Sequence, residues 1–320
     1  MLTDLSESQL WDYRSEVSMP ADFDQFWQQT LQESASYDLA VTIEPVDIGL
    51  TTLDLFDVSF AGFGGERIKG WFITPAKAEG LLPIVVEYVG YGGGRGAPFD
   101  HLQYASSGFA HFVMDTRGQG STWSVGETAD SAGSGPSVPG FLTRGIESRE
   151  KYYYLRLFAD AVRAVDAAKQ LPRVDPSRVA VVGGSQGGAL ALSVTALRDD
   201  ISAVAAFVPF LCDMRRASLI TDSEPYAELR RYLATHRHSV DAVFNTLAYF
   251  DGVNMARRAT APAWISVGLM DPVCPPSTVF GAFQNYAGPK KLAVWRYNDH
   301  VGGGVEDLRI ALRAFREVLI

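Results

Sequence analysis

The sequence has few cysteines and no apolar run long enough to span a membrane. Only Cys212 and Cys274 occur in 320 residues, which is too few for a disulfide framework or, by themselves, for a tetrahedral zinc site. The longest apolar stretch, around residues 201–212, is far too short to cross a bilayer. The first residues are acidic, whereas a signal peptide begins with positive charge. We therefore expect a reduced, cytoplasmic protein with no membrane partner.

Basic charge is also scarce. The chain has 28 Lys and Arg against 37 Asp and Glu, which gives a formal net charge of -9. Nucleic-acid binding needs clustered basic residues that face phosphates, and here they are scattered. The sequence thus argues against a nucleic-acid partner. Because 47% of the residues are hydrophobic, the chain can bury a large core, and we expect a single domain over residues 1–320.

Hydrophobic periodicity predicts an α/β protein. Residues 22–34 place apolar side chains on one helical face, and the stretches 53–60 and 68–74 read as an antiparallel pair of strands joined by the turn FGGE. Downstream, short apolar strands alternate with helical segments, which is typical of a mostly parallel sheet flanked by helices. These strands are expected at residues 82–89, 111–114, 179–182, 204–208, 263–267 and 292–297, with a helix over 150–171.

Two segments interrupt this alternation. Residues 121–145 are rich in Gly, Ser and Pro, including GSGPSVPG at 133–140, and we expect a long surface loop near the sheet edge. Residues 215–258 have a helical pattern between two strands, which is the usual position for a cap or a subunit-contact insertion. Neither segment has enough apolar residues for a core of its own, so both are expected within the one domain.

A glycine-rich motif, Gly183-Gly184-Ser185-Gln186-Gly187, follows an apolar strand and precedes a helical segment. It fits G-x-S-x-G, in which a sharp turn exposes a serine at the amino end of a helix and small neighbours prevent collisions. A Gly-rich phosphate-binding turn is the alternative. No complete G-x-G-x-x-G and no Gly-Lys-Ser/Thr occurs, so we favour Ser185 as a nucleophile.

A serine nucleophile needs a histidine as its base. In this type of fold the catalytic residues follow the order Ser, acid, His, each after a strand. Only His300 follows a strand-like run after Ser185, and it is the predicted base. The other histidines are His101, His111, His236 and His238. His236 and His238 lie in the segment HRH, which is a weak metal signal without further ligands, so no metal site is expected.

The base in turn needs a carboxylate that orients it. Asp271 ends the strand PAWISVGLM and is the preferred candidate. Asp213, after the preceding strand, is a rival, and Asp299 is too close in sequence to His300 to support it easily. An Asp before Pro272 is also a common turn former, so the residue pattern leaves a structural alternative.

The loop Gly90-Tyr91-Gly92-Gly93-Gly94 follows another predicted strand. Lipases carry a similar run there, and its main chain supplies one N–H of the oxyanion hole. The second donor is the N–H of the residue after the nucleophile. We therefore predict the backbone N–H groups of Tyr91 and Gln186 as the oxyanion donors, with a plain Gly-rich turn as the alternative.

Seven segments together resemble carbohydrate esterase family 7, the acetyl xylan esterases and cephalosporin C deacetylases. They follow the family order across nearly the whole chain: RIKGWFITP (67–75), GYGGGRG (90–96), VMDTRGQG (113–120), GGSQGG (183–188), DPVCPPSTVFGAF (271–283), YAGPKK (286–291) and YNDHVGGG (297–304). The resemblance implies an α/β-hydrolase fold with an N-terminal antiparallel extension and a helical insertion. It also implies a serine esterase that deacetylates small substrates, such as acetylated xylo-oligosaccharides and cephalosporin C, without a cofactor.

Matching positions carry the family roles onto this sequence: Ser185 as nucleophile, His300 as base, Asp271 as its orienter, and Tyr91 and Gln186 as oxyanion donors. The family's RGQ motif falls at residues 117–119 and is expected to organise the loop beneath the site, and Trp123 to line the acyl pocket. The family is intracellular and forms ring-like hexamers, so the resemblance also implies a homohexamer.

One position departs from the family pattern. The family usually has Glu after the catalytic histidine, whereas this chain has Val301 before three glycines. We expect activity to survive, with a changed histidine loop or substrate preference. Peptidase, thioesterase or lactonase activity would share the same catalytic residues, and a binding protein on the same fold is the non-enzymatic alternative.

Overall fold

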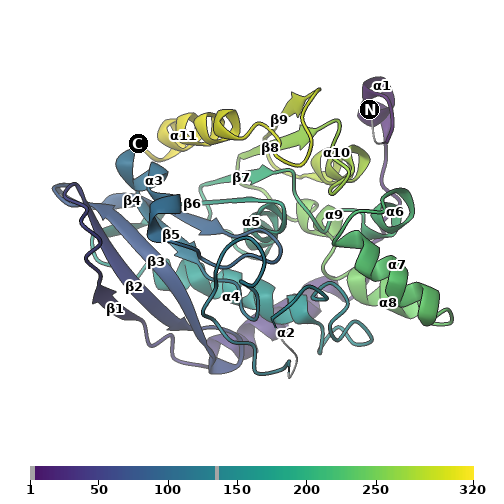
Figure 1. Cartoon of the computed structure of the whole chain (residues 1–320), viewed down its shortest axis with the longest axis horizontal. Helices are drawn as coiled ribbons and strands as arrows, with labels where there is room; N and C mark the ends of the chain where they lie inside the picture. The colour runs from purple at the N-terminus through teal and green to yellow at the C-terminus, as the bar shows by residue number, and fades with distance from the viewer. Residues whose placement is uncertain (1–3, 134–136) are drawn as a thin grey trace.

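The computed structural model describes residues 4–133 and 137–320, so positions 134–136 of the expected loop lie outside the described residues. Within these residues nine strands form one sheet in the order β1-β2-β3-β5-β4-β6-β7-β8-β9 (Figure 1). The strands are β1 Thr42–Pro45, β2 Leu53–Ala61, β3 Arg67–Pro75, β4 Leu82–Tyr88, β5 Ala110–Met114, β6 Val174–Gly184, β7 Ala203–Phe207, β8 Ala263–Gly268 and β9 Lys290–Trp295.

Pairing divides the sheet into two parts. The pairs β1/β2, β2/β3 and β3/β5 are antiparallel, whereas β5, β4, β6, β7, β8 and β9 run parallel. Parallel strands need helical crossovers and become buried on both faces, which is why the central strands β4, β5 and β7 are mostly apolar and almost wholly buried. The edge strand β9 is only partly buried. The predicted parallel sheet and the opening antiparallel pair are confirmed, and every predicted strand is present with shifted ends.

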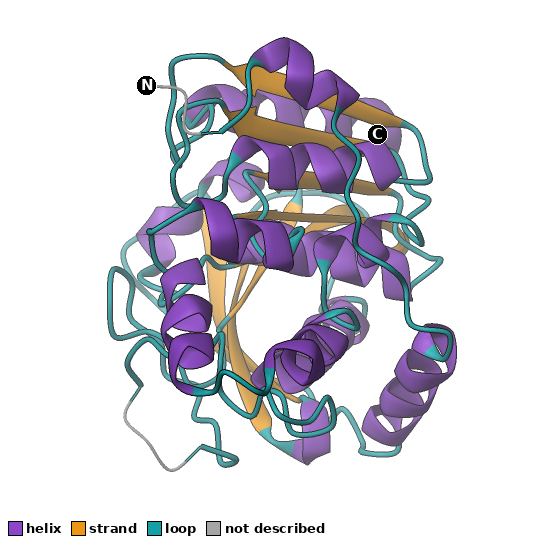
Figure 2. Ribbon diagram, turned by 90° about the vertical axis from the view of Figure 1, so that its right-hand side faces the viewer, coloured by secondary structure: helices purple, strands orange, loops and turns teal. Residues whose placement is uncertain are grey.

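Helices cover both faces of the sheet (Figure 2). The face of the larger core carries α2, α4, α5, α9 and α10, and the opposite face carries α3 and α11. None of the described helices is long and apolar enough to cross a membrane. The helices are α1 Glu7–Asp12, α2 Phe23–Ala35, α3 Gln103–Ser106, α4 Tyr153–Ala168, α5 Gln186–Leu197, α6 Met214–Ile220, α7 Tyr226–Thr235, α8 Val240–Leu247, α9 Gly252–Ala256, α10 Pro276–Asn285 and α11 Val305–Leu319, with short 3-10 turns η1 Phe63–Gly65 and η2 Pro98–His101.

The two insertions behave differently. Residues 215–258 form the expected helices, from α6 to α9, between β7 and β8 (Figure 1). The expectation of a surface loop over residues 121–145 is wrong for part of it, because Phe141 and Leu142 are fully buried in the larger core. Ser124 accepts a hydrogen bond from Gly94 N through its carbonyl oxygen at 3.0 Å, so the loop also runs against the loop after β4. The Gly-, Ser- and Pro-rich composition of this segment gave no indication of its buried residues or of its contact with the loop after β4.

A buried ion pair fixes the chain after β5. Arg117 is fully buried and donates from Nη2 to Asp160 Oδ1 of α4 at 2.8 Å, and its Nη1 donates to Glu66 Oε2 at 3.1 Å. Asp160 Oδ1 also accepts from the Phe63 backbone N–H at 2.7 Å. The arginine of the RGQ motif therefore joins the antiparallel extension to the helical layer beneath the loop.

Replacing Arg117 by methionine should destabilise the protein by about 3–5 kcal/mol, because it leaves a buried carboxylate without its partner. The free energy of unfolding from urea denaturation measures this loss. Arg309→Met is the matched control, since Arg309 pairs with Glu306 on the surface and its side chain is 63% exposed. Equal stability of the two variants would mean that the buried pair does not contribute as described.

Candidate active site

Ser185 lies between β6 and α5 in a backbone conformation that non-glycine residues rarely adopt, with φ 56° and ψ -119°. Three backbone hydrogen bonds hold the turn: Ser185 N donates to Phe207 O at 2.9 Å, and Ser185 O accepts from Ala189 N and Phe210 N, each at 3.0 Å. Strained residues of this kind persist where the surrounding structure fixes them, often at functional sites. The turn therefore holds the backbone that carries the serine hydroxyl in a fixed position.

Close packing explains the glycines around this serine. A Cβ on Gly183 would lie 2.3 Å from the carbonyl carbon of Gly187, and one on Gly187 would lie 2.0 Å from Tyr88 O of β4. Both distances are far below contact, so any side chain would push the helix away from the sheet. The sequence pattern G-x-S-x-G is thus a packing requirement of the turn.

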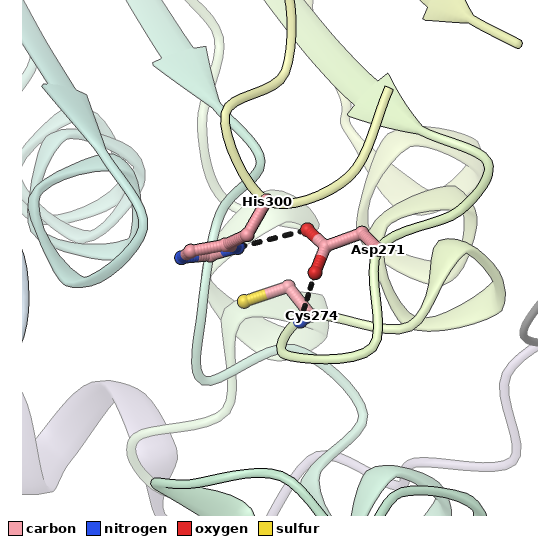
Figure 3. A group of neighbouring side chains, drawn as sticks. All are labelled: Asp271, Cys274 and His300. Atoms are coloured by element: carbon pink, nitrogen blue, oxygen red, sulfur yellow. Dashed lines mark hydrogen bonds and ion pairs between the residues drawn. The ribbon is translucent and has the colours of Figure 1, made fainter. Parts of the chain in front are cut away.

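Asp271 and His300 meet at the carboxyl ends of β8 and β9. His300 Nδ1 and Asp271 Oδ2 are 2.8 Å apart, and Asp271 Oδ1 accepts the backbone N–H groups of Val273 and Cys274 at 2.8 and 2.9 Å (Figure 3). Asp271 is fully buried, whereas the His300 side chain is 29% exposed. This arrangement fixes the carboxylate and leaves one face of the imidazole open.

A second carboxylate holds the loop that follows His300. Asp307 Oδ2 accepts from Gly303 N at 2.7 Å and from Ser266 Oγ at 2.8 Å, and Oδ1 accepts from Trp295 Nε1 at 2.9 Å. Burial raises the pKa of Asp307, and these three donors oppose the rise. Val301 itself is 70% exposed. The histidine loop therefore has a buried anchor that does not involve residue 301.

The other candidate acids lie apart from the imidazole contact. Asp213 is buried at the start of α6, where its Oδ2 accepts from Tyr13 Oη at 2.6 Å. Asp299 Oδ1 accepts from the Val301 backbone N–H at 3.1 Å. Among the described carboxylates, Asp271 is the one bonded to His300.

The remaining histidines have other surroundings. His236 and His238 are exposed in the helical insertion. His101 and His111 are buried beside Glu87 of β4, with His111 Nε2 2.8 Å and His101 Nδ1 3.4 Å from Glu87 Oε2. Burial alone would raise the pKa of Glu87, but the two imidazoles together outweigh it and hold this pKa well below its usual range. Of these four, His101 lines the same cavity as Ser185, with its imidazole beside Glu87, and the other three are not among the described lining residues of that cavity.

Tyr91, in the loop after β4, is held by hydrogen bonds at its backbone carbonyl and at its hydroxyl. Its carbonyl oxygen accepts from Trp123 Nε1 at 2.8 Å. Its hydroxyl donates to Glu228 Oε1 of α7 at 2.5 Å and accepts from the backbone N–H groups of Gly140 and Phe141 at 3.1 and 2.9 Å. Burial raises the pKa of both the tyrosine and the glutamic acid. The helical insertion and the long loop thus fix the backbone around the predicted donor.

Gln186 is the first residue of α5, so its backbone N–H has no acceptor within the helix and remains available to a ligand. Its buried side chain donates from Nε2 to Val89 O at 3.2 Å and accepts from Gln119 Nε2 and Tyr154 Oη, both at 3.0 Å. Gln119 Oε1 in turn accepts from Gly92 N at 2.6 Å. The glutamine of the RGQ motif therefore connects the loop after β4 to the serine turn.

A cavity of about 870 Å³ opens over these groups. Ser185, His300 and Tyr91 line it together with Trp123, whose side chain is 64% exposed, and Val301. Its described lining includes no lysine or arginine but four acidic residues: Glu87, Asp100, Glu224 and Asp307. The predicted nucleophile, base and first oxyanion donor thus share one cavity, and Trp123 lies in its wall.

Sequence patterns missed three residues of this neighbourhood. Glu228 lies 137 positions from Tyr91, so only the folded chain brings them together. Asp307 follows the histidine by seven positions and had no pattern of its own. Cys274 is buried three positions after Asp271, and its Sγ lies within 4.8 Å of ligand atoms of Asp271 and His300. Its closeness in sequence to the predicted acid was the one signal that could have found it.

Comparison with known proteins gives consistent matches. Residues 1–311 match the family model described as acetyl xylan esterase (AXE1). An acetyl esterase, Axe7A of Xylanibacter ruminicola, is 32% identical over 290 residues, which cover 88% of this chain and 63% of that protein. The chain therefore spans less than two thirds of the length of this curated relative.

Two solved structures are similar over almost their whole length. The acetyl xylan esterase from Paenibacillus sp. R4 has a TM-score of 0.92 and 37% sequence identity, with 98% of this chain and 100% of that chain covered. Acetyl xylan esterase 1 from Thermoanaerobacterium sp. JW/SL YS485 has a TM-score of 0.90 and 32% identity, with 99% and 100% covered. These likenesses confirm the predicted α/β-hydrolase fold.

Proposed function

Because the chain belongs to the acetyl xylan esterase family, we propose that it hydrolyses the acetyl esters of small alcohols at Ser185. The observation that carries the proposal is the 2.8 Å contact between His300 Nδ1 and Asp271 Oδ2 beside a cavity that Ser185 also lines. A base held by a buried carboxylate next to a serine at a strained turn is the arrangement that acyl transfer requires.

In the proposed mechanism, Asp271 keeps the proton of the imidazole on Nδ1, so that Nε2 is free to accept the proton of Ser185 as its oxygen attacks the acetyl carbonyl. The backbone N–H groups of Tyr91 and Gln186 bind the oxyanion. The imidazolium then protonates the leaving alcohol, which leaves an acetyl-enzyme. Water, deprotonated by the same histidine, attacks this ester and releases acetate.

The substrates we propose are acetylated xylo-oligosaccharides and cephalosporin C-like esters. A cavity of about 870 Å³ has room for a leaving group much larger than acetate. The proposed cytoplasmic location has the support of the sequence composition and of the family resemblance. The proposed homohexameric assembly has the support of the resemblance alone, and light scattering of the purified protein tests it. Release of acetate from p-nitrophenyl acetate, acetylated xylo-oligosaccharides and cephalosporin C, compared with longer acyl esters and peptides, tests the activity.

The acidic lining predicts a preference for neutral over anionic leaving groups. Negative charge around the cavity repels an anion, and this effect weakens as salt screens it. We expect kcat/KM for 4-acetoxybenzamide to exceed that for 4-acetoxybenzoate by about tenfold at low salt, after correction for their hydroxide-catalysed rates. Asp100→Asn, which changes an exposed lining residue, should reduce the ratio, whereas Asp175→Asn, away from the cavity lining, should not. A ratio of one at low salt contradicts the prediction.

Removing the hydroxyl of Tyr91 should slow catalysis more than it weakens substrate binding. The oxyanion donor acts in the transition state, so a loosened Tyr91 backbone lowers kcat and leaves KM nearly unchanged. For Tyr91→Phe we expect a kcat about tenfold below wild type, a part of the 10²–10³-fold cost of losing a donor outright. Steady-state kinetics with p-nitrophenyl acetate measure it. Tyr232→Phe, which loses a contact with the exposed Glu147, is the control, and an unchanged kcat in Tyr91→Phe would refute the role.

A further inference from the structure

Cys274 lies beside the proposed base and its carboxylate but takes no part in the proposed mechanism. Its Sγ, a carboxylate oxygen of Asp271 and an imidazole nitrogen of His300 all lie within 4.8 Å of one another. Figure 3 shows the three side chains converging, with the sulfur below the imidazole ring. Three different ligand atoms therefore lie close together, and one of them belongs to His300, which lines the cavity.

The chain holds this cluster in place. Asp271 Oδ1 accepts the backbone N–H of Cys274 at 2.9 Å, so the carboxylate fixes the position of the thiol as well as that of the imidazole. The thiol and the carboxylate are buried, whereas the imidazole is half-buried at the cavity surface. A small ion can therefore reach the cluster from the side of His300.

Thiolate, imidazole and carboxylate are the ligands that zinc prefers, and three protein ligands with an open fourth position are a common arrangement. Zinc bonds of about 2.0–2.3 Å bring tetrahedral ligand atoms to within about 4 Å of one another, so the side chains need to close by only about an ångström. We propose that Asp271, Cys274 and His300 form an inhibitory site for a thiophilic divalent cation such as Zn²⁺ or Cd²⁺.

Occupation of this site stops the proposed reaction through either imidazole nitrogen. An ion on Nδ1 replaces the contact with Asp271 and moves the imidazole proton from Nδ1 to Nε2, where it blocks transfer from Ser185. An ion on Nε2 occupies the atom that accepts the serine proton. The S–H bond of Cys274 breaks, its proton goes to solvent, and a metal–sulfur bond forms. Mg²⁺ and Ca²⁺ prefer oxygen ligands, so they do not replace the proton of this thiol.

The inference rests on the proposed function for its readout, and two cysteine variants test it. We expect Zn²⁺ or Cd²⁺ to slow hydrolysis of p-nitrophenyl acetate by about tenfold or more, EDTA to restore it, and Mg²⁺ to have no effect. Cys274→Ser should need at least about tenfold more Zn²⁺ for half-inhibition relative to its own metal-free rate, because a hydroxyl is a poor zinc ligand. Cys212→Ser is the matched control: Cys212 is also free and buried but outside the cluster.

Equal sensitivity of Cys274→Ser and wild type would overturn the site. If Cys274→Ser does not fold, the test uses Cys212→Ser, which keeps Cys274 as its one thiol. Ultraviolet absorption of a cadmium–thiolate bond in that variant shows whether Cd²⁺ binds Cys274. No such absorption at an inhibitory Cd²⁺ concentration also overturns it. Failure of the proposed function looks different: the metal-free wild type then releases no acetate, while cadmium–thiolate absorption still reports whether the ion binds.

Discussion

Ser185→Ala should lose about 10⁶-fold in kcat for acetyl-ester hydrolysis, because the variant has no hydroxyl to form the acetyl-enzyme. The fold should remain intact, since the alanine keeps the same backbone groups and the serine side chain makes no capping hydrogen bond to α5. Acetate release from p-nitrophenyl acetate measures the loss, and circular dichroism with thermal unfolding checks the fold.

A buried serine in helix α5 provides the control. Ser193 Oγ donates to Ala189 O at 2.8 Å, away from the cavity lining. Ser193→Ala should retain activity and react with a fluorophosphonate probe, whereas Ser185→Ala should not be labelled. Full activity of Ser185→Ala would exclude this serine as the nucleophile, and an unlabelled, inactive wild type would favour a binding protein on the same fold.

Asp271→Asn should lower kcat about 10⁴-fold with little change in shape. Its Oδ1 accepts two backbone N–H groups, so the amide oxygen of asparagine occupies that place and its NH₂ group faces His300 Nδ1. Nδ1 then becomes an acceptor and the proton moves to Nε2, where it blocks transfer from Ser185. Kinetics with p-nitrophenyl acetate measure the loss.

The two rival carboxylates serve as controls for this variant. Asp213→Asn and Asp299→Asn should keep most of the activity, because these residues contact Tyr13 and the Val301 backbone, respectively. A severe loss in Asp299→Asn together with an active Asp271→Asn would transfer the orienting role to Asp299. The structure and the sequence order both favour Asp271.

The sequence predicted the elements that follow from periodicity and from local turn chemistry. The central parallel strands were found because burial on both faces makes most of their residues apolar, and the serine turn was found because its glycines are sterically required. The edge strand β1 was missed: its sequence is TIEP, largely exposed and containing a proline. The predicted helical segment after the motif is α5, which begins at Gln186, directly after the serine.

Contacts between distant parts of the chain were beyond sequence reasoning. The Tyr91–Glu228 hydrogen bond joins a loop after a central strand to an insertion whose helices had no assigned partner. The position of Asp307 depends on Ser266 and Trp295, which come from two neighbouring strands. Such pairs carry no local pattern, since Glu228 and Asp307 are each, taken alone, an ordinary acidic residue on a helix.

The strained backbone at Ser185 has a consequence for directed evolution. Glycine adopts a positive φ without the steric penalty of a Cβ, so the substitution Ser185→Gly would relieve the strain of the turn while losing the hydroxyl. A library screened only for heat resistance would therefore enrich inactive clones at this position. A selection for more stable variants of this chain must therefore screen for catalytic activity as well as for heat resistance.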